Sequence, residues 1–306
     1  MIYTVTLNPS IDYVVQVSKM QLGKLNKMDS DLKLPGGKGI NVSRILRELN
    51  TETIALGFLG GFTGTFISNW LEREGVKSEF IPISDDTRIN IKLKSDFETE
   101  INGHGPEITE TEAKNLVSQL DSITEQDTII LSGSKPPSLP RDFYQIIVEK
   151  VTQKKASFVI DTTGQDLLVS LPFQPLLVKP NLEELAELFN VSIQNKEEVI
   201  PYGKKLLEQG AKHVIVSMAG EGALLFTKDG IYQGINPNGN VKNSVGAGDS
   251  MIAGFIGNYS KTKDAVSAFK MGIASGSATA FSNDLATKKD IDKILNQVEV
   301  HHYNQS

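Results

Sequence analysis

Short apolar segments alternate with helical patterns along most of the chain. The apolar segments are Ile54–Leu59, Thr128–Leu131, Phe158–Ile160, Leu176–Val178 and Val214–Val216, and the first residues, Met1–Leu7, also have a strand-like pattern. The helical segments include Thr109–Leu120, Leu182–Phe189 and Lys196–Gln209. Strands that are apolar almost throughout and are separated by helices predict βαβ units, with a parallel sheet covered by helices on both faces.

Two segments depart from this rhythm. Thr87–Lys94 alternates strictly, with Ile89, Ile91 and Leu93 on one face and Arg88, Asn90, Lys92 and Lys94 on the other. Asp12–Val17 is also strand-like and begins with a polar residue. We expect a small antiparallel sheet inserted into the α/β core, with strands from about 11–33 and 87–102. A lid or a dimer interface would use such a sheet, and a solvated sheet edge is the alternative.

The predicted strands end in small or polar residues. The junctions read Leu131-Ser-Gly-Ser134, Ile160-Asp-Thr-Thr163, Val178-Lys-Pro-Asn181 and Val216-Ser-Met-Ala-Gly-Glu-Gly222. Any strand must end in a turn, which explains one such junction better than four in succession. Because ligands of open α/β sheets bind beyond the carboxyl ends of the strands, these junctions predict a site at that edge.

A glycine-rich segment near the C-terminal end carries the most specific chemistry. It reads Asn243-Ser-Val-Gly-Ala-Gly-Asp-Ser250 and leads into a helical pattern. The N–H groups of Gly246, Ala247 and Gly248 at a helix N-terminus would bind an anion. Asp249 beside them could accept a proton from an attacking hydroxyl. This arrangement predicts phosphoryl transfer, and an ordinary turn with an Asp N-cap is the alternative.

A second glycine-rich segment, Leu34–Ser43, precedes another helical pattern. Gly36, Gly37 and Gly39 allow the backbone to approach a ligand closely, and Lys38 and Asn41 add a cation and an amide. The chain has no Walker A spacing. It also lacks a Gly-x-Gly-x-x-Gly fingerprint after its first strand, which argues against a dinucleotide-dependent oxidoreductase.

Composition narrows the chemistry further. The 306 residues include no cysteine and four histidines, which leaves carboxylates, lysine, arginine and backbone amides as the reactive groups. A net charge of −6 without a basic stripe argues against nucleic-acid binding. No apolar run reaches the roughly 18 residues of a membrane span, and the N-terminal segment does not resemble a signal peptide. We therefore expect a cytoplasmic protein without a membrane partner.

The two glycine-rich segments, roughly 200 residues apart, resemble the signatures of the ribokinase-like (PfkB) sugar kinase family. Further matches are Thr6–Asp12, Asp86–Asn90, Ser132–Pro137 and Lys179–Glu184, which resemble the phosphofructokinase branch. The resemblance implies an α/β fold with a three-layer α/β/α core, a mostly parallel sheet and a small β-sheet lid. It extends over nearly the whole chain, so we expect one kinase domain over residues 1–306.

The resemblance also implies roles for individual residues. Asp249 matches the catalytic base, and Gly246, Ala247 and Gly248 match the anion hole. The residues matching the sugar-binding positions are Asp12, Gly36, Gly37, Lys38 and Asn41. Arg88 matches a lid arginine that binds the phosphate already on the substrate, and Lys27 and Lys135 are weaker candidates for the same phosphate.

For the nucleotide, the resemblance implies ATP with Mg²⁺. Lys179, Asn181 and Glu184 match an element that binds Mg²⁺ through its waters, so Glu184 is an indirect metal ligand. Ser217, Gly220 and Gly222 match the loop at the adenine and ribose, and Gly276 lies in the segment flanking the base. Asn243 and Ser244 stand where relatives often have Asp and Thr, which puts any monovalent-cation site there in doubt.

We expect phosphorylation of fructose 1-phosphate at its 6-hydroxyl. The alternatives are the same chemistry on tagatose 6-phosphate or fructose 6-phosphate, and, from another class, a sugar-phosphate sensor without catalysis. Because the apolar lid face needs cover, we also expect a homodimer formed through the lid.

Overall fold

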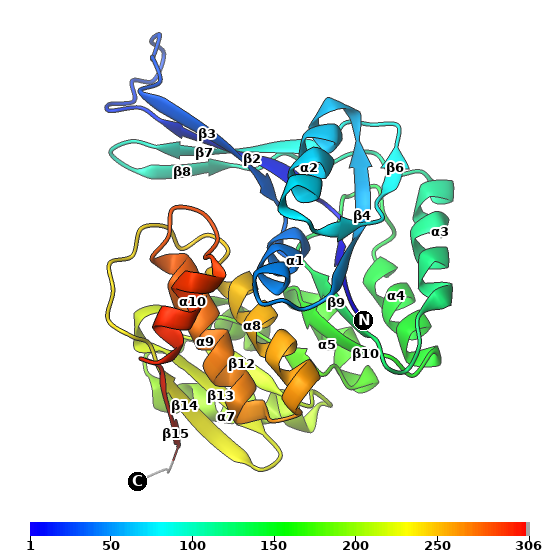
Figure 1. Ribbon diagram of the computed structural model, residues 1–306, viewed down its shortest axis with the longest axis vertical. Coiled ribbons are helices and arrows are strands. Elements are labelled where there is room, and N and C mark those ends of the chain that lie inside the picture. The colour runs from blue at the N-terminus through cyan, green and yellow to red at the C-terminus, as the bar shows by residue number, and fades with distance from the viewer. Residues whose placement is uncertain (304–306) are drawn as a thin grey trace.

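The computed structural model describes residues 1–303, so the last three residues of the expected domain range lie outside it. An eleven-stranded sheet runs in the order β15-β14-β13-β12-β11-β10-β9-β1-β4-β5, with β6 also paired to β4 (Figure 1). Its strands are β1 (Ile2–Thr6), β4 (Thr53–Gly60), β5 (Lys77–Ser78), β6 (Ile81–Ile83), β9 (Thr128–Ser132), β10 (Ser157–Asp161), β11 (Leu177–Val178), β12 (Val214–Ser217), β13 (Ala223–Thr227), β14 (Gly230–Ile235) and β15 (Glu299–His302). All the strand pairs between β5 and β12 in this order are parallel. Strands β13, β14 and β15 each run antiparallel to the neighbour that precedes them in the sequence.

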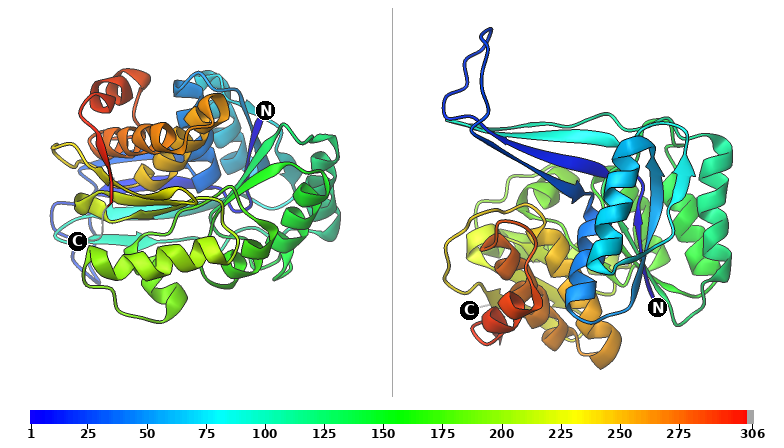
Figure 2. Two further views of the ribbon diagram at one scale, coloured as in Figure 1. Left: turned by 90° about the horizontal axis from the view of Figure 1, so that it is seen from below. Right: turned by 45° about the horizontal axis from the view of Figure 1, so that its top comes forward.

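Helices cover both faces of this sheet (Figure 2). One layer contains α1 (Lys38–Glu48), α2 (Gly61–Glu74), α8 (Ala247–Thr262), α9 (Ala265–Ala280) and α10 (Lys288–Leu295). The other contains α3 (Glu110–Gln119), α4 (Phe143–Gln153), α5 (Gly164–Ser170), α6 (Leu182–Phe189) and α7 (Lys196–Glu208). The predicted three-layer α/β/α fold is therefore confirmed, and a capping box of Thr109 and Glu112 begins α3.

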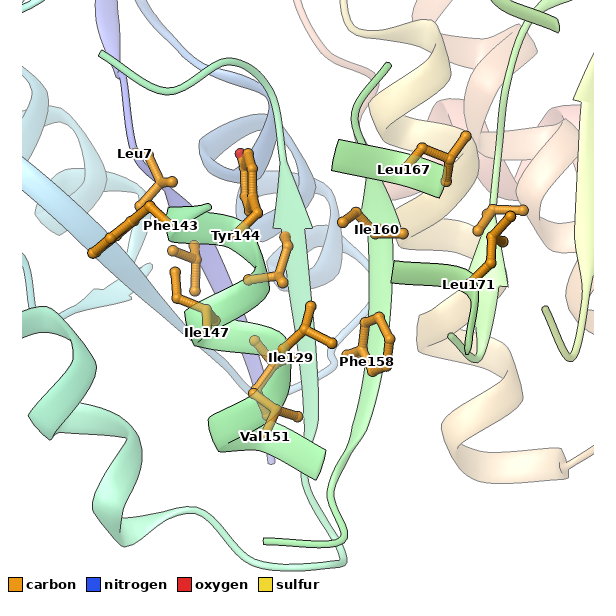
Figure 3. Packing of buried hydrophobic residues seen from close by; sticks show 14 of the residues in the cluster. Leu7, Ile129, Phe143, Tyr144, Ile147, Val151, Phe158, Ile160, Leu167 and Leu171 are labelled. Carbon is orange, nitrogen blue, oxygen red and sulfur yellow. The ribbon is translucent and has the colours of Figure 1, made fainter. Parts of the chain in front are cut away.

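The central strands supply both apolar layers because successive side chains point to opposite faces. Ile129 and Leu131 on β9 face the α4 side, whereas Ile130 between them faces the α8 side. Figure 3 shows the first of these layers, in which Phe158 of β10 and Tyr144 of α4 lie among aliphatic side chains. Burial on both faces explains why these segments are continuously apolar in the sequence.

The second sheet projects beyond the carboxyl edge of the first (Figure 1). Its order is β3-β2-β7-β8, formed by β2 (Ser10–Gln16), β3 (Ser30–Gly36), β7 (Arg88–Lys94) and β8 (Glu98–Ile101). The expectation of an antiparallel sheet was partly wrong, because β2 and β7 are parallel while the outer pairs are antiparallel. The two inner strands both leave the core at the same edge, so they run in the same direction.

On β7 of this lid sheet, the polar face is the more deeply buried one. Asn90 and Lys92 are each 8% exposed, whereas Ile89 on the opposite face is 41% exposed. The predicted alternation of β7 is therefore present, with its polar side turned inward over the edge of the large sheet. Among residues 1–303, no helix is both long and apolar enough to cross a membrane.

Candidate active site

A cavity of about 720 Å³ lies where the lid sheet meets the carboxyl edge of the large sheet. Residues at or just beyond the ends of four parallel strands line it: Thr6, Ser132, Lys179 and Ser217. Three of the four junctions identified in the sequence therefore converge on one space, and the exception is Ile160-Asp-Thr-Thr163, whose residues do not line the cavity. The buried side-chain oxygens of Thr6, Asn8 and Ser132 have no hydrogen-bond partner within residues 1–303, so they are available to a polar ligand.

Asp249 lies in the first turn of α8 and is 6% exposed. Asn41 on α1 donates a hydrogen bond from Nδ2 to Asp249 Oδ2 over 2.8 Å, which fixes the orientation of the carboxyl group. Burial, followed by the nearby Asp161 carboxylate, raises the pKa of Asp249 to about 6. A carboxyl group with this pKa is ionised at neutral pH and is a stronger proton acceptor than an ordinary aspartate.

The start of α8 supplies an anion-binding backbone. Gly246 precedes the helix at φ 78°, a left-handed conformation that favours glycine. Gly246 and Gly248 line the cavity. Ala247 faces a neighbouring cavity instead, and its N–H donates to the Ser244 carbonyl over 3.2 Å. The structure thus brings two of the three predicted anion-hole residues to the same space as Asp249.

An ion cluster around the buried Asp161 lies next to the start of α8. Asp161, at the end of β10, pairs with Lys38 Nζ at 3.0 Å and with Lys179 Nζ at 3.6 Å. Burial alone would raise the pKa of Asp161, but the two ammonium groups outweigh it and hold the pKa below its usual value. A Cβ added at Gly248 would lie 3.1 Å from Lys179 Nζ, so this ammonium group approaches the helix start closely. Two positive charges therefore lie beside the predicted anion hole.

The lid sheet also contributes the carboxylate of Asp12 to the cavity. Asp12 Oδ1 accepts hydrogen bonds from Ser10 Oγ at 2.8 Å and from Asn90 Nδ2 at 3.2 Å. Lys92 Nζ lies 3.8 Å from Asp12 Oδ2. A Cβ at Gly36 would lie only 2.4 Å from Asp12 Oδ1, so glycine is required where β3 passes this carboxylate.

Arg88, the first residue of β7, also lines the cavity. Its guanidinium donates to the main-chain carbonyls of Asn8 and Gly103, with the shortest distance 2.9 Å to each. Within residues 1–303 no carboxylate forms an ion pair with it, and burial lowers the pKa of Arg88. A half-buried guanidinium that only carbonyls hold in place is suited to binding an anionic ligand.

A second cavity of about 470 Å³ adjoins the first. Asn181, Ser217 and Gly248 line both. Its walls include the sequence-predicted Gly220, Gly222 and Gly276. A Cβ at Gly222 would lie 2.1 Å from the Gly234 carbonyl oxygen, and one at Gly276 would lie 3.0 Å from that of Ala247, so both glycines permit close packing of the wall.

Two adjoining cavities, with a buried carboxyl group and a helix N-terminus near their junction, have the geometry of a phosphoryl-transfer site. A family model described as pfkB family carbohydrate kinase matches residues 5–291. The chain belongs to this family.

Curated relatives and solved structures agree with this assignment. The chain is 50% identical over 300 residues to a 1-phosphofructokinase of Bacillus subtilis strain 168, covering 98% of this chain and 99% of the relative. It is 34% identical over 303 residues to a D-tagatose-1-phosphate kinase of Bacillus licheniformis, covering 99% and 100%. Phosphofructokinase-2 from Escherichia coli in complex with fructose-6-phosphate superposes with a TM-score of 0.90 at 27% identity, covering 96% and 98%. The ribokinase-like fold expected from the sequence is thereby confirmed.

In this pfkB family member, Asn181 and Glu184 form a capping box at the start of α6. Glu184 N donates to Asn181 Oδ1 at 2.8 Å, and Asn181 N donates to Glu184 Oε2 at 2.9 Å. Both residues line the cavity, and no group of three His, Cys, Asp or Glu in residues 1–303 could hold a metal ion. A lone carboxylate fits a Mg²⁺ ion that is carried mainly by substrate phosphates and water.

Two weaker sequence candidates lie away from the cavity of this kinase. Lys27 is exposed in the loop between β2 and β3. Lys135 forms an ion pair with Asp166 and lies 5.6 Å from the centre of the Tyr144 ring. Neither residue lines the cavity, and Lys135 is held instead by its carboxylate partner.

Three further residues at the site were not predicted from the sequence: Asp161, Asn90 and Lys92. Asp161 is the last residue of β10, and its place in one of the polar strand-end junctions was the available signal. Asn90 and Lys92 lie on the polar face of β7, two and four residues after Arg88. Side chains of a strand alternate between its two faces, so Arg88, Asn90 and Lys92 share one face of β7. Because Arg88 was predicted to face the substrate, Asn90 and Lys92 could have been predicted to face it as well.

Proposed function

We propose that this chain catalyses ATP-dependent phosphorylation of fructose 1-phosphate at the 6-hydroxyl, giving fructose 1,6-bisphosphate. The observation that carries this proposal is the buried Asp249, with its raised pKa, in the same cavity as Arg88. A phosphoryl transfer to an alcohol needs a base at the attacking hydroxyl. A substrate that is already phosphorylated needs a fixed cation, and Arg88 supplies one.

In the proposed reaction, Asp249 Oδ accepts the proton of the 6-hydroxyl while that oxygen attacks the γ-phosphorus of ATP. The bond from the γ-phosphorus to the bridging oxygen breaks, and ADP leaves with that electron pair. The N–H groups of Gly246 and Gly248, together with Lys38 and Lys179, stabilise negative charge on the transferring group. Asn41 keeps the carboxylate of Asp249 directed at the hydroxyl.

ATP would occupy the second cavity with its phosphates directed toward α8. This orientation is supported by Asn181, Ser217 and Gly248, which line both cavities and so mark where the two ligands meet. Mg²⁺ would neutralise charge on the ATP phosphates, with Glu184 binding one of its waters. Asp12 would hold sugar hydroxyls, since hydrogen bonds from Ser10 and Asn90 fix its position.

The position of the phosphate on the sugar is the main open choice among substrates. The relative at 50% identity is named for fructose 1-phosphate, which favours that substrate here. A tagatose kinase is also among the relatives, but it is named for tagatose 1-phosphate rather than for the tagatose 6-phosphate given above as an alternative. Tagatose 1-phosphate differs from fructose 1-phosphate only in the configuration at one carbon. It therefore joins tagatose 6-phosphate and fructose 6-phosphate as an alternative substrate.

The test is ADP release from Mg·ATP with each of the four sugar phosphates. We expect kcat/KM for fructose 1-phosphate to exceed that for each of the others by 100-fold or more, about 2.7 kcal/mol of discrimination. A preference for another sugar phosphate would overturn the substrate and leave the base in place. Absence of turnover with all four would favour the non-catalytic sensor.

We also propose that the enzyme is a homodimer formed through the lid sheet. Of the thirteen large apolar side chains that are most exposed in residues 1–303, eight belong to the lid strands and their loops. They are Met20, Leu22, Leu25, Met28, Leu32, Ile89, Phe97 and Ile101. A second copy of the lid would remove this concentration of apolar surface from water. A cytoplasmic location and a single kinase domain remain predictions.

A further inference from the structure

The segment between α9 and α10, residues 281–287, lies against the residues that lead into α8. Residues 243–248 are called the anion loop here. A Cβ at Gly246 would lie 2.6 Å from Leu285 Cδ2, so the leucine is packed directly on this glycine. Asn243 Nδ2 donates to the Asn283 carbonyl oxygen over 3.2 Å. The position of this segment therefore constrains the anion loop at two points.

The segment is itself held by an ion cluster made of Arg44, Glu74 and Asp284. Arg44 is 7% exposed, and its Nη2 and Nη1 lie 2.6 Å and 3.2 Å from the two carboxylate oxygens of Asp284. On its other side, Nε and Nη2 lie 2.7 Å and 2.8 Å from Glu74. A guanidinium that binds two carboxylates in this forked manner fixes both in direction as well as in distance.

Arg44 lies on α1 three residues after Asn41, nearly one helical turn along. Helix α1 therefore acts on Asp249 directly and on the anion loop through the 281–287 segment. Asn41 orients the carboxylate of Asp249, and Arg44 holds the segment whose Leu285 packs on Gly246. A third contact, from Lys288 N to Glu48 Oε2 over 2.7 Å, joins the end of α1 to the start of α10.

We propose that Arg44 and Asp284 are positioning residues for phosphoryl transfer, acting through the 281–287 segment on the anion loop. This inference rests on the proposed function of that loop. The N–H groups of Gly246 and Gly248 must meet charge that develops during transfer, and a displacement of about 1 Å at such a site lowers the rate about 100-fold. Substrate binding before transfer depends mainly on other residues, so loss of the Arg44–Asp284 pair should affect kcat more than KM.

The decisive variant is Asp284→Ala, with Glu74→Ala as the matched control. Each removes one carboxylate from Arg44, but only the first releases the segment next to the anion loop. We expect Asp284→Ala to lower kcat at least tenfold with both KM values within threefold of wild type. Glu74→Ala should keep kcat within twofold, although both variants lower Tm. Equal losses of kcat in the two variants, or unchanged kcat in Asp284→Ala, would overturn the proposal.

Leu285→Ala provides the same test without altering charge, and it decides the matter if Asp284→Ala does not fold. It should lower kcat at least fivefold by loosening the contact with Gly246, again with little change in KM. Unchanged kcat in this variant would contradict the proposed route.

Hydrogen–deuterium exchange separates this inference from the proposed function. The peptide spanning residues 243–250 should exchange at least fivefold faster in Asp284→Ala than in wild type or Glu74→Ala. This readout requires no substrate, so it remains decisive even if the wild-type enzyme phosphorylates none of the sugar phosphates. Equal exchange in all three proteins would overturn the positioning role.

Discussion

The pKa of the Asp249 carboxyl group results from two sets of opposing interactions. Burial and the neighbouring Asp161 carboxylate favour its neutral form, while Lys38, Asn41 and Lys179 favour the anion. The balance leaves a pKa of about 6, low enough for ionisation at neutral pH and high enough for effective proton acceptance. The chemistry of this residue is therefore set by neighbours that are distant from it in the sequence.

Replacing Asp249 by Asn should remove the base while retaining the hydrogen bond from Asn41. We expect kcat to fall about 10²–10⁴-fold, the usual contribution of a general base, with little change in KM for the sugar phosphate. ADP release under saturating Mg·ATP measures the change. A variant that retains more than a tenth of wild-type kcat would exclude Asp249 as the base.

The pH dependence of the wild-type enzyme should reveal the same group. Because only ionised Asp249 can accept the proton, kcat/KM should fall about tenfold per pH unit below pH 6 and level off above about pH 7. Initial rates between pH 5 and pH 8 in buffers of constant ionic strength provide the profile. A profile that is flat from pH 5 to pH 8 would contradict the assignment.

The raised pKa also has a stability consequence. The folded state binds the Asp249 proton more tightly than the unfolded state, so this group stabilises the fold at low pH. That contribution is lost as pH rises from 3.8, its ordinary pKa, through about 6. The difference corresponds to about 3 kcal/mol at pH 8. Asp249→Asn should therefore unfold at higher urea concentration than wild type at pH 8, and the gain should shrink at pH 5. Equal urea midpoints at pH 8 would be inconsistent with this view.

At the scale of elements, the anion loop depends on how closely α8 and α9 pack. A Cβ at Gly254 of α8 would lie 2.5 Å from the Met271 carbonyl oxygen of α9, and one at Gly272 would lie 2.9 Å from that of Met251. Glycine at these positions lets the two backbones approach. The start of α8 is thus positioned partly by an interface along the length of the helix.

Two Gly→Ala replacements in α8 should have different effects on stability. Gly254→Ala forces the helices apart and should lower the free energy of unfolding by about 1–3 kcal/mol. Gly257→Ala is the matched control, because its nearest neighbours are side-chain atoms, the closest being Leu46 Cδ2 at 3.2 Å. At this position alanine stabilises the helix by about 1 kcal/mol relative to glycine. This gain should equal or exceed the free-energy cost of the close contact. Urea denaturation distinguishes the two, and an equal loss in both variants would refute the packing argument.

Element positions were largely predictable because local rules govern them. The predicted helix Leu182–Phe189 matches α6, and its Asn181 cap is a local hydrogen-bond pattern. The direction of β2 relative to β7 was not predictable, because it depends on where both strands leave the core. The place of Lys135 was missed for a similar reason, since its Asp166 partner lies 31 residues further along the chain.

At the scale of the whole molecule, the lid sheet turns its polar face to the cavity and leaves Ile89 and Ile101 exposed, at 41% and 58%. If two lids associate through this surface, a charge placed on it should separate the subunits. The cavity would then lose the support of its neighbour, and KM for the sugar phosphate should rise.

Ile89→Asp should therefore convert the enzyme from a dimer to a monomer in light scattering after size exclusion. Phe62→Asp is the control, because Phe62 is a 72% exposed apolar residue on α2, outside the lid. That variant should keep the wild-type mass. A wild-type protein that is a monomer at micromolar concentration, or a dimer insensitive to Ile89→Asp, would exclude association through the lid.

The sequence by itself determined the alternation of strands and helices and the two glycine-rich segments, and it marked Asp249 as the predicted base. These features depend on side-chain period and backbone freedom, which neighbouring residues fix. Tertiary structure alone decided that Asp161 would join Lys38 and Lys179, and that Arg44 would hold a segment 240 residues away. Burial then set the charge balance at Asp249, because desolvation depends on the whole surrounding fold.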